Sequence, residues 1–115
     1  MCLSKVTDNV KQFITKEGNK LVGYKVFDTD NHQLGFYERG GRVKINKWMK
    51  DKKDGPIFYT IQKSYRTGFH IYLRLEDIKK QEWRKVYYKK PVAYGFQGGQ
   101  AIVVARELFV PIKKR

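Results

Sequence analysis

The chain of 115 residues has little of the chemistry that builds disulfide or metal centres. Cys2 is its only cysteine, so neither a disulfide framework nor a thiolate metal site can form within one chain, which fits a reducing cytosol. The two histidines, His32 and His70, are far apart in sequence, and no His/Cys pair has the spacing of metal ligands. We therefore expect neither a metal nor a cofactor.

Long apolar runs are also absent. The opening segment, MCLSKVTDNVKQF, reaches a charged residue within its first five positions, which does not match a signal peptide or a membrane span. We expect a soluble, cytoplasmic protein that does not insert into a membrane. With 41% hydrophobic residues and no repeat or Ser/Pro-rich linker, the composition is typical of one globular domain over residues 1–115.

Acidic residues are scarce, since 11 Asp and Glu stand against 25 Lys and Arg and leave a net charge of +14. The excess lies in the middle of the chain, where residues 39–90 hold 16 basic and 5 acidic side chains. Such a field attracts polyanions, so nucleic acid, a ribonucleoprotein and an acidic protein or membrane surface are the classes of partner to consider. It excludes an acidic mimic of DNA.

The apolar pattern predicts an α+β fold, a mostly antiparallel sheet with one or two helices packed on one face. Helical spacing at residues 5–16, and acids followed by lysines at 75–83, predict the helices. Strand-forming residues predict strands at 21–28, 33–38, 42–48, 57–63, 67–74, 85–90, 92–96, 101–106 and 108–112. The apolar run 101–105 is typical of a central strand buried on both faces, and GFQGGQ at 95–100 of a turn between strands.

Basic residues interleaved with aromatic ones are the best candidates for a binding surface. On the predicted strand 85–90, Val86 and Tyr88 would face inward and leave Lys85, Tyr87 and Lys89 outside. Cations fix phosphates and a ring can stack on a base, so such a stripe has the chemistry of a nucleic-acid face. The alternative is a solvated surface that only keeps the protein soluble.

A second basic stripe is predicted on strand 42–48, the turn before it and the loop beyond it, whereas both tryptophans are expected in the core or at its edge. The full set of candidate contacts to a nucleic acid or partner is Arg39, Arg42, Lys44, Lys47, Lys50, Lys52, Lys53, Arg84, Lys85, Tyr87 and Lys89.

His70 is the candidate for catalysis. On a strand through 68–74, Phe69, Ile71 and Leu73 share one face, which places His70 outside if that face is core. It is then either a base or substrate contact, or an ordinary surface residue. Because no nucleophile elbow or carboxylate partner is visible, we favour the surface residue. The residues of a candidate cleft are His70, Tyr72, Arg74 and Gln100.

Four segments resemble a group of small phage and prophage proteins. They are MCLSK at 1–5, GYKVF at 23–27, GFHIYLRLEDIKK at 68–80 and VAYGFQGGQAIVVARELFV at 92–110. The resemblance implies a phage-related origin. It also implies a small basic accessory protein that acts in a bacterial host cell on nucleic acid or on a host nucleoprotein, for instance as an inhibitor of an immune or transcription complex.

A second likeness is to the ADP-ribosyltransferase fold, in which a Gly-aromatic strand also leads into a helix, then a strand like KVYYKK and a closing strand like AIVVARELFV. Activity in that family depends on a Glu near the last strand and an Arg or His on the first. Here Gln100 and either Tyr24 or Lys25 stand at those places. The likeness therefore implies at most an inactive cleft.

Three hypotheses follow from the sequence. The first is a non-enzymatic protein that binds nucleic acid or a host nucleoprotein through its basic face, with no membrane or metal partner. The second is an enzymatic one, an ADP-ribosyltransferase-like or other nucleotide-binding domain with His70, Tyr72 and Gln100 near its site. The third is a protein-only interaction module that docks on an acidic partner. The oligomeric state is left open.

Overall fold

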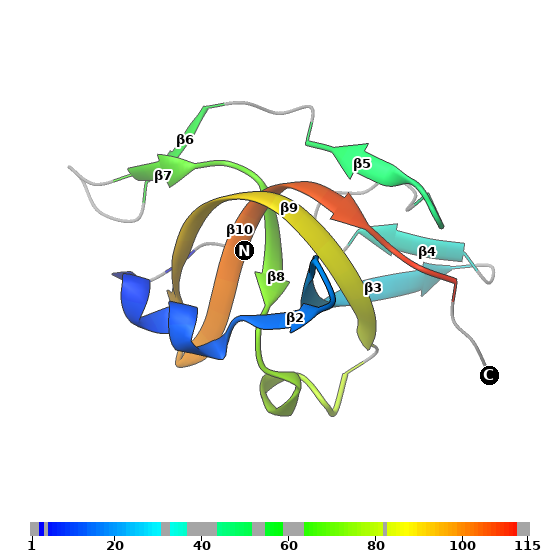
Figure 1. Ribbon diagram of the computed structural model, residues 1–115, viewed down its shortest axis with the longest axis horizontal. Coiled ribbons are helices and arrows are strands. Elements are labelled where there is room, and N and C mark those ends of the chain that lie inside the picture. Colours follow the sequence, from blue (N-terminus) through cyan, green and yellow to red (C-terminus); the bar gives the residue numbers. More distant parts are fainter. Residues whose placement is uncertain are drawn as a thin grey trace.

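A computed structural model describes Leu3 and residues 5–30, 33–36, 44–51, 55–58, 64–81 and 83–112 (Figure 1). The elements in these ranges are β1 (Lys5–Val6), η1 (Asp8–Phe13), β2 (Thr15–Glu17), β3 (Lys20–Asp30), β4 (Gln33–Phe36), β5 (Trp48–Lys50), β6 (Pro56–Phe58), β7 (Ser64–Arg66), β8 (Phe69–Tyr72), η2 (Leu75–Asp77), β9 (Trp83–Gln97) and β10 (Gln100–Phe109). The described strands pair in antiparallel fashion, which confirms the mostly antiparallel sheet expected from the sequence.

Four of these strands close into a ring. β9 pairs with β10, β10 with β8, and β3 joins both β8, at Tyr24 and Tyr72, and the first half of β9. β9 can pair with both β10 and β3 because it is long and strongly curved, as its arch in Figure 1 shows. The closed ring has an inner face and an outer face, and both bury apolar side chains.

The inner cluster includes Val86, Tyr88 and Val103, and the outer cluster includes Tyr72, Ile102 and Val104. On β10 the two sets alternate, so every residue from 101 to 105 is buried. The central strand that is buried on both faces is therefore confirmed, as is the inward orientation of Val86 and Tyr88.

The two helical segments are shorter than the sequence predicts. η1 and η2 are 3-10 turns of six and three residues. Val10 of η1 packs into the inner cluster, whereas Ile78, which follows η2, packs into the outer one. The predicted helices over 5–16 and 75–83 are wrong in type and extent, because pairing of the chain on either side with other strands limits each segment to the turn between them.

The hairpin of β3 and β4 and the turn at Gly98 and Gly99 are confirmed. The strand predicted at 42–48 is wrong in its described part, because Asn46 adopts a φ of 58° and only Trp48 begins β5. At the other end of the chain, the segments predicted as four separate strands form only β9 and β10. Pro111 lies beyond β10, outside any strand.

One residue of β9 is extra relative to β10. Ala93 lies opposite Val104 and Pro91 lies opposite Ala105, so Val92 has no counterpart and the strand contains a β-bulge. Lys90, just before it, adopts a φ of 55°, and Pro91 supplies no N–H to the ladder. From Ala105 onward, each residue of β10 therefore pairs with the β9 residue one position earlier than it would without the bulge.

The hydroxyl of Tyr88 lies inside the ring without a hydrogen-bond partner among the residues that the structure describes. Burial raises the pKa of this phenol, because its anion would lose its hydration. The unpaired hydroxyl opposes folding at any pH, since water would satisfy it in the unfolded chain, whereas the raised pKa opposes folding only at high pH, where the unfolded phenol ionises.

We expect Tyr88→Phe to raise the free energy of unfolding by about 1–2 kcal/mol, because it removes an unsatisfied buried donor. Since the folded pKa is raised, the native protein should lose stability as pH rises above the ordinary tyrosine value of 10.0, and the variant should lose less. Urea denaturation at pH 7 and pH 10.5 measures both effects. Tyr87→Phe is the control, because that hydroxyl has a partner, Glu17, and its loss should not stabilise.

In the part of the chain that the structure describes, no helix has the length and apolarity needed to cross a bilayer.

Candidate nucleic-acid interface

Three aromatic side chains line up across neighbouring strands on the outside of the sheet. Phe109 of β10 lies directly opposite Trp48 of β5 on one side and opposite Tyr87 of β9 on the other. The ring centroids are 5.4 Å apart for Trp48 and Phe109, and 6.1 Å apart for Tyr87 and Phe109. We call these three side chains the ring row. Trp48 is 36% exposed and the other two are half-buried, so the row is open to solvent.

Lysine side chains lie over the ring row. The Lys89 ammonium is 4.1 Å from the centroid of Trp48, and those of Lys20 and Lys85 are 4.9 and 5.6 Å from the centroid of Tyr87. Exposed Lys50 lies two residues after Trp48 on β5, and therefore on the same side of that strand. Each end of the row thus carries positive charge.

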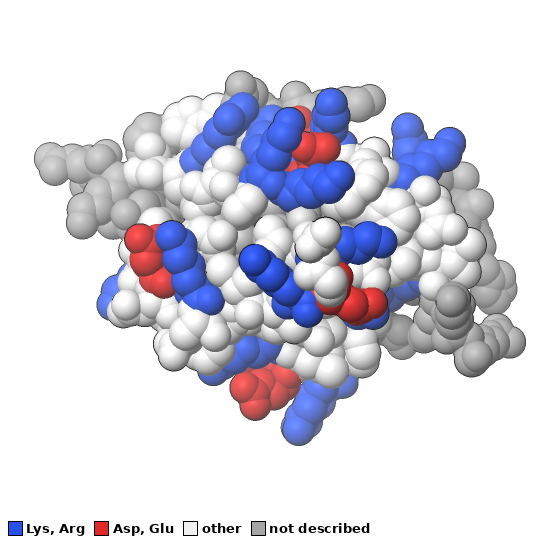
Figure 2. Space-filling view, viewed as in Figure 1, with Lys and Arg blue, Asp and Glu red and all other residues white. Residues whose placement is uncertain are grey.

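Two carboxylates accompany these lysines. Glu17 accepts hydrogen bonds from Lys85 Nζ at 2.7 Å and Tyr87 Oη at 3.1 Å, and Glu107 pairs with Lys90 Nζ at 3.2 Å. The hydrogen bond from Lys85 lowers the pKa of Glu17 most, and the one from Tyr87 lowers it further. The bond between Lys85 and Glu17 in turn raises the pKa of Lys85. Figure 2 likewise shows basic side chains spread over the viewed face, with acidic groups lying against basic ones.

Around the row, the lysines outnumber the acids. The described charged residues are Lys20, Lys50, Lys85, Lys89 and Lys90 against Glu17 and Glu107. The surface can therefore attract an anion even with both internal ion pairs formed.

The basic residues predicted from the sequence do not all lie here. Lys50, Lys85, Tyr87 and Lys89 do, while Lys44 and Lys47 are exposed in the segment before β5 and share no strand. Arg84 is displaced from the stripe: its guanidinium donates to the Pro111 carbonyl at 2.7 Å, and burial lowers its pKa. The remaining four candidates lie outside the described residues: Arg39, Arg42, Lys52 and Lys53.

Three contributors were missed from the sequence: Trp48 and Phe109 as ring-row members, and Lys20 beside them. The sequence predicts Trp48 and Trp83 in the core or at its edge, and each is 36% exposed, with Trp83 edge-on against Tyr24 and their centroids 5.7 Å apart. Neither lies in the core, because both occupy strand positions that point away from the inner cluster, so only the edge position of that prediction remains. The ring row follows from the register of β10 with β5 and β9, and the register of β10 with β9 depends on the β-bulge at Val92.

His70 is not a surface residue, so that prediction is wrong. It is only 7% exposed, and its Nε2 lies 2.9 Å from the hydroxyl of Tyr65, which also accepts the N–H of Leu3 at 2.9 Å. The outer face of β8 is covered by these residues, so His70 is a buried polar residue with a hydrogen-bond partner. The other histidine, His32, lies outside the described residues.

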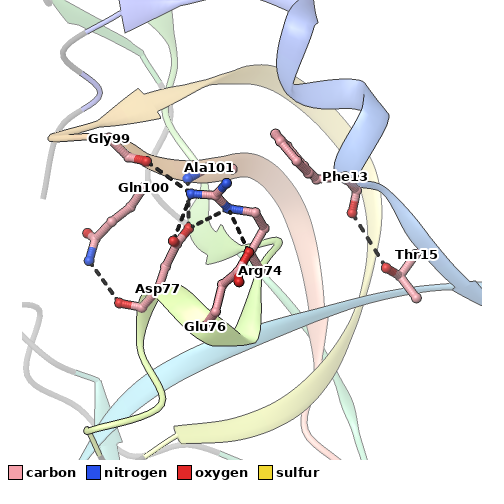
Figure 3. Close-up of polar contacts among 8 residues, drawn as sticks. All are labelled: Phe13, Thr15, Arg74, Glu76, Asp77, Gly99, Gln100 and Ala101. Carbon is pink, nitrogen blue, oxygen red and sulfur yellow. Dashed lines mark hydrogen bonds and ion pairs between the residues drawn. The ribbon is translucent and has the colours of Figure 1, made fainter.

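The other candidate cleft residues divide between two places. Tyr72 is buried in the outer cluster, whereas Arg74 and Gln100 meet at Asp77 (Figure 3). Arg74 donates to both carboxylate oxygens of Asp77, from Nε at 3.0 Å and from Nη2 at 2.8 Å, and stacks on Phe13 with its Cζ 4.8 Å from the ring centroid. The four residues therefore do not form one cleft.

Arg74 borders an open groove of about 480 Å³. Its other lining residues include Phe13, Thr15, Tyr24 and Glu76. Both carboxylate oxygens of Asp77 accept hydrogen bonds from Arg74, so this carboxylate has a structural role. Among the described residues, no group of three His, Cys, Asp or Glu side chains comes together to hold a metal ion.

Comparison with protein-family models, with curated proteins and with solved structures gives no match for this chain.

Proposed function

We propose that the protein binds nucleic acid through the ring row and its lysines, without catalysing a reaction. The observation that supports this best is the alignment of Trp48, Phe109 and Tyr87 in register on an open sheet surface, with lysine ammonium groups directly over the rings. Apolar rings at a solvated surface are costly for solubility, and this combination has the chemistry of a face that contacts bases and phosphates together.

The energies favour a bound base over a bound ammonium. An exposed cation–π contact contributes about 0.5–1 kcal/mol. A base stacked on an aromatic side chain contributes about 1–3 kcal/mol. A base can therefore displace Lys89 or Lys20 from its ring, and the displaced ammonium remains close enough to contact a phosphate.

The net charge of +14 adds a long-range attraction to the same class of partner. The short motifs that resemble phage and prophage proteins suggest where such a partner is found. On that basis we propose a cytoplasmic accessory protein in a bacterial host, with nucleic acid or a host nucleoprotein as its target.

Charge reversal at the ring row tests the proposal. We expect Lys50→Glu/Lys89→Glu to weaken binding to a labelled oligonucleotide at least tenfold at 150 mM salt. The variant should also reduce the steepness of the log–log salt dependence by about 1.4–1.8, because two phosphate contacts are lost. Fluorescence anisotropy over a salt titration measures both quantities.

The matched control is Lys79→Glu/Lys80→Glu. It changes the net charge equally, but at exposed lysines that follow η2, in the lower part of Figure 1. It should weaken binding by less and leave the salt dependence nearly unchanged. Equal effects of the two variants would show that the charge acts generically and would remove the ring row from the site.

The other two hypotheses give different outcomes. Absence of binding to any oligonucleotide, with capture of an acidic host protein that survives nuclease treatment, would favour a protein-only module. Saturable binding of a dinucleotide that is lost in His70→Ala would favour the nucleotide-binding domain.

A further inference from the structure

We propose that the ligand of the ring row is a single-stranded nucleic acid, whose unpaired bases stack on Trp48, Phe109 and Tyr87. This inference rests on the proposed function and names the substrate class. The three rings form one continuous line, since Phe109 is the cross-strand neighbour of both others. Such a line presents ring surface and few hydrogen-bonding groups, which suits the face of a base better than its edge.

A duplex cannot use this surface in the same way. In duplex DNA the faces of the bases are covered by their neighbours, and only their edges are accessible in the grooves. An α-helix or a two-stranded ribbon commonly reads the major groove. The described residues contain no α-helix, and the ring row lies on the outer face of a sheet within three neighbouring strands, β5, β10 and β9.

The rings of the row lie side by side and are not stacked on one another. Neighbouring centroids are 5.4 and 6.1 Å apart, and the rings are tilted by 48° and 43° to one another. Because the rings do not cover each other, the face of each is left for a base, apart from the lysine above it. Lys20 and Lys85 at the Tyr87 end, and Lys89 and Lys50 at the Trp48 end, place ammonium groups beside these positions for the phosphates.

The described side chains at the row also predict little preference for base sequence. The cations there are lysines, which act as point charges, whereas the planar fork of an arginine would be needed for a bidentate contact to guanine. Arg84, the nearest arginine along β9, is held instead by the Pro111 carbonyl. Stacking tolerates every base, because every base has a flat face.

Competition between single-stranded DNA and the duplex of the same sequence tests the inference. We expect the single strand to bind at least tenfold more tightly at 150 mM salt. In a Trp83→Phe background, Trp48 is the only tryptophan, so its fluorescence should be quenched by the single strand and not by the duplex. Trp48→Leu keeps an apolar side chain at an exposed position and removes the ring. It should weaken single-strand binding about tenfold and leave duplex binding nearly unchanged.

The outcomes separate this inference from the proposed function. If neither polymer binds, the proposed function itself is wrong. If both bind equally and Lys50→Glu/Lys89→Glu weakens both, the proposed function stands and single-strand selectivity is wrong. If the single strand is preferred but Trp48→Leu has no effect, the ring row is not the stacking surface, and the inference is overturned on that ground.

Discussion

Gly23→Ala is expected to lower the free energy of unfolding by about 2–3 kcal/mol, because an added methyl group overpacks the place where the ring of strands closes. Gly23 precedes Tyr24, the residue through which β3 pairs with β8. A Cβ at position 23 would clash with Cγ2 of Ile71 and lie 3.2 Å from the Tyr72 carbonyl oxygen. Ile71 is fully buried in the inner cluster and has no room to move away.

A double-mutant cycle identifies the cause. Ile71→Ala removes the clashing Cγ2 and alone should cost about 2–5 kcal/mol through the cavity that it leaves. Gly23→Ala/Ile71→Ala should cost at least 1 kcal/mol less than the sum of the single changes, because the new methyl group fills part of that cavity. Ile71→Val is the control, since it retains Cγ2 and should give no relief. Additive costs in both cycles, measured by urea denaturation, would contradict the steric explanation.

Asp77→Ala is expected to cost about 2–3 kcal/mol. The Asp77 carboxylate, with a side chain 10% exposed, accepts two hydrogen bonds from Arg74 and one from the N–H of Ala101 at 3.1 Å. Removal of one partner of a buried ion pair costs about 3–5 kcal/mol, because the other charge is left uncompensated. The effect should be smaller here, since the Arg74 side chain is 28% exposed and water can reach it.

Glu76→Ala is the matched control for Asp77→Ala. Glu76 is the neighbouring acid and its Oε1 lies 3.8 Å from Arg74 Nε, but its side chain is 71% exposed. We expect its removal to change stability by less than about 0.5 kcal/mol. Thermal unfolding of the two variants compares them directly, and similar losses would show that Asp77 contributes only the charge and not the links to Arg74 and β10.

The sequence predicts the sheet well where local patterns decide the structure. The alternation in KVYYKK correctly placed Val86 and Tyr88 inside, and the glycines at 98 and 99 correctly marked the turn into the central strand. The ring row depends instead on a non-local detail. In an unbroken hairpin from that turn, Tyr87 would lie opposite Val110, but the bulge at Val92 places Phe109 there.

The wrong predictions have the same origin. Helical spacing and charge order favour helices at 5–16 and 75–83, but local preference is weak compared with the strand pairing available to the flanking residues. His70 was placed outside because the alternation rule assumes that one face of the strand is solvated. The outer face of β8 is covered by Tyr65 of the preceding strand β7 and by Leu3, which is distant in sequence, so the alternation along β8 alone does not reveal it.

The position of β10 in the chain has a consequence for synthesis on the ribosome. β10 has strand neighbours on both edges, and it supplies buried residues to both clusters, yet it follows every other described strand in the sequence. Until residues 100–109 have been synthesised and have left the ribosome, β8 and β9 lack the strand that lies between them. Their apolar faces and open edges are then exposed, so this protein should depend on chaperones, or on fast completion of translation, more than a helical protein of equal size.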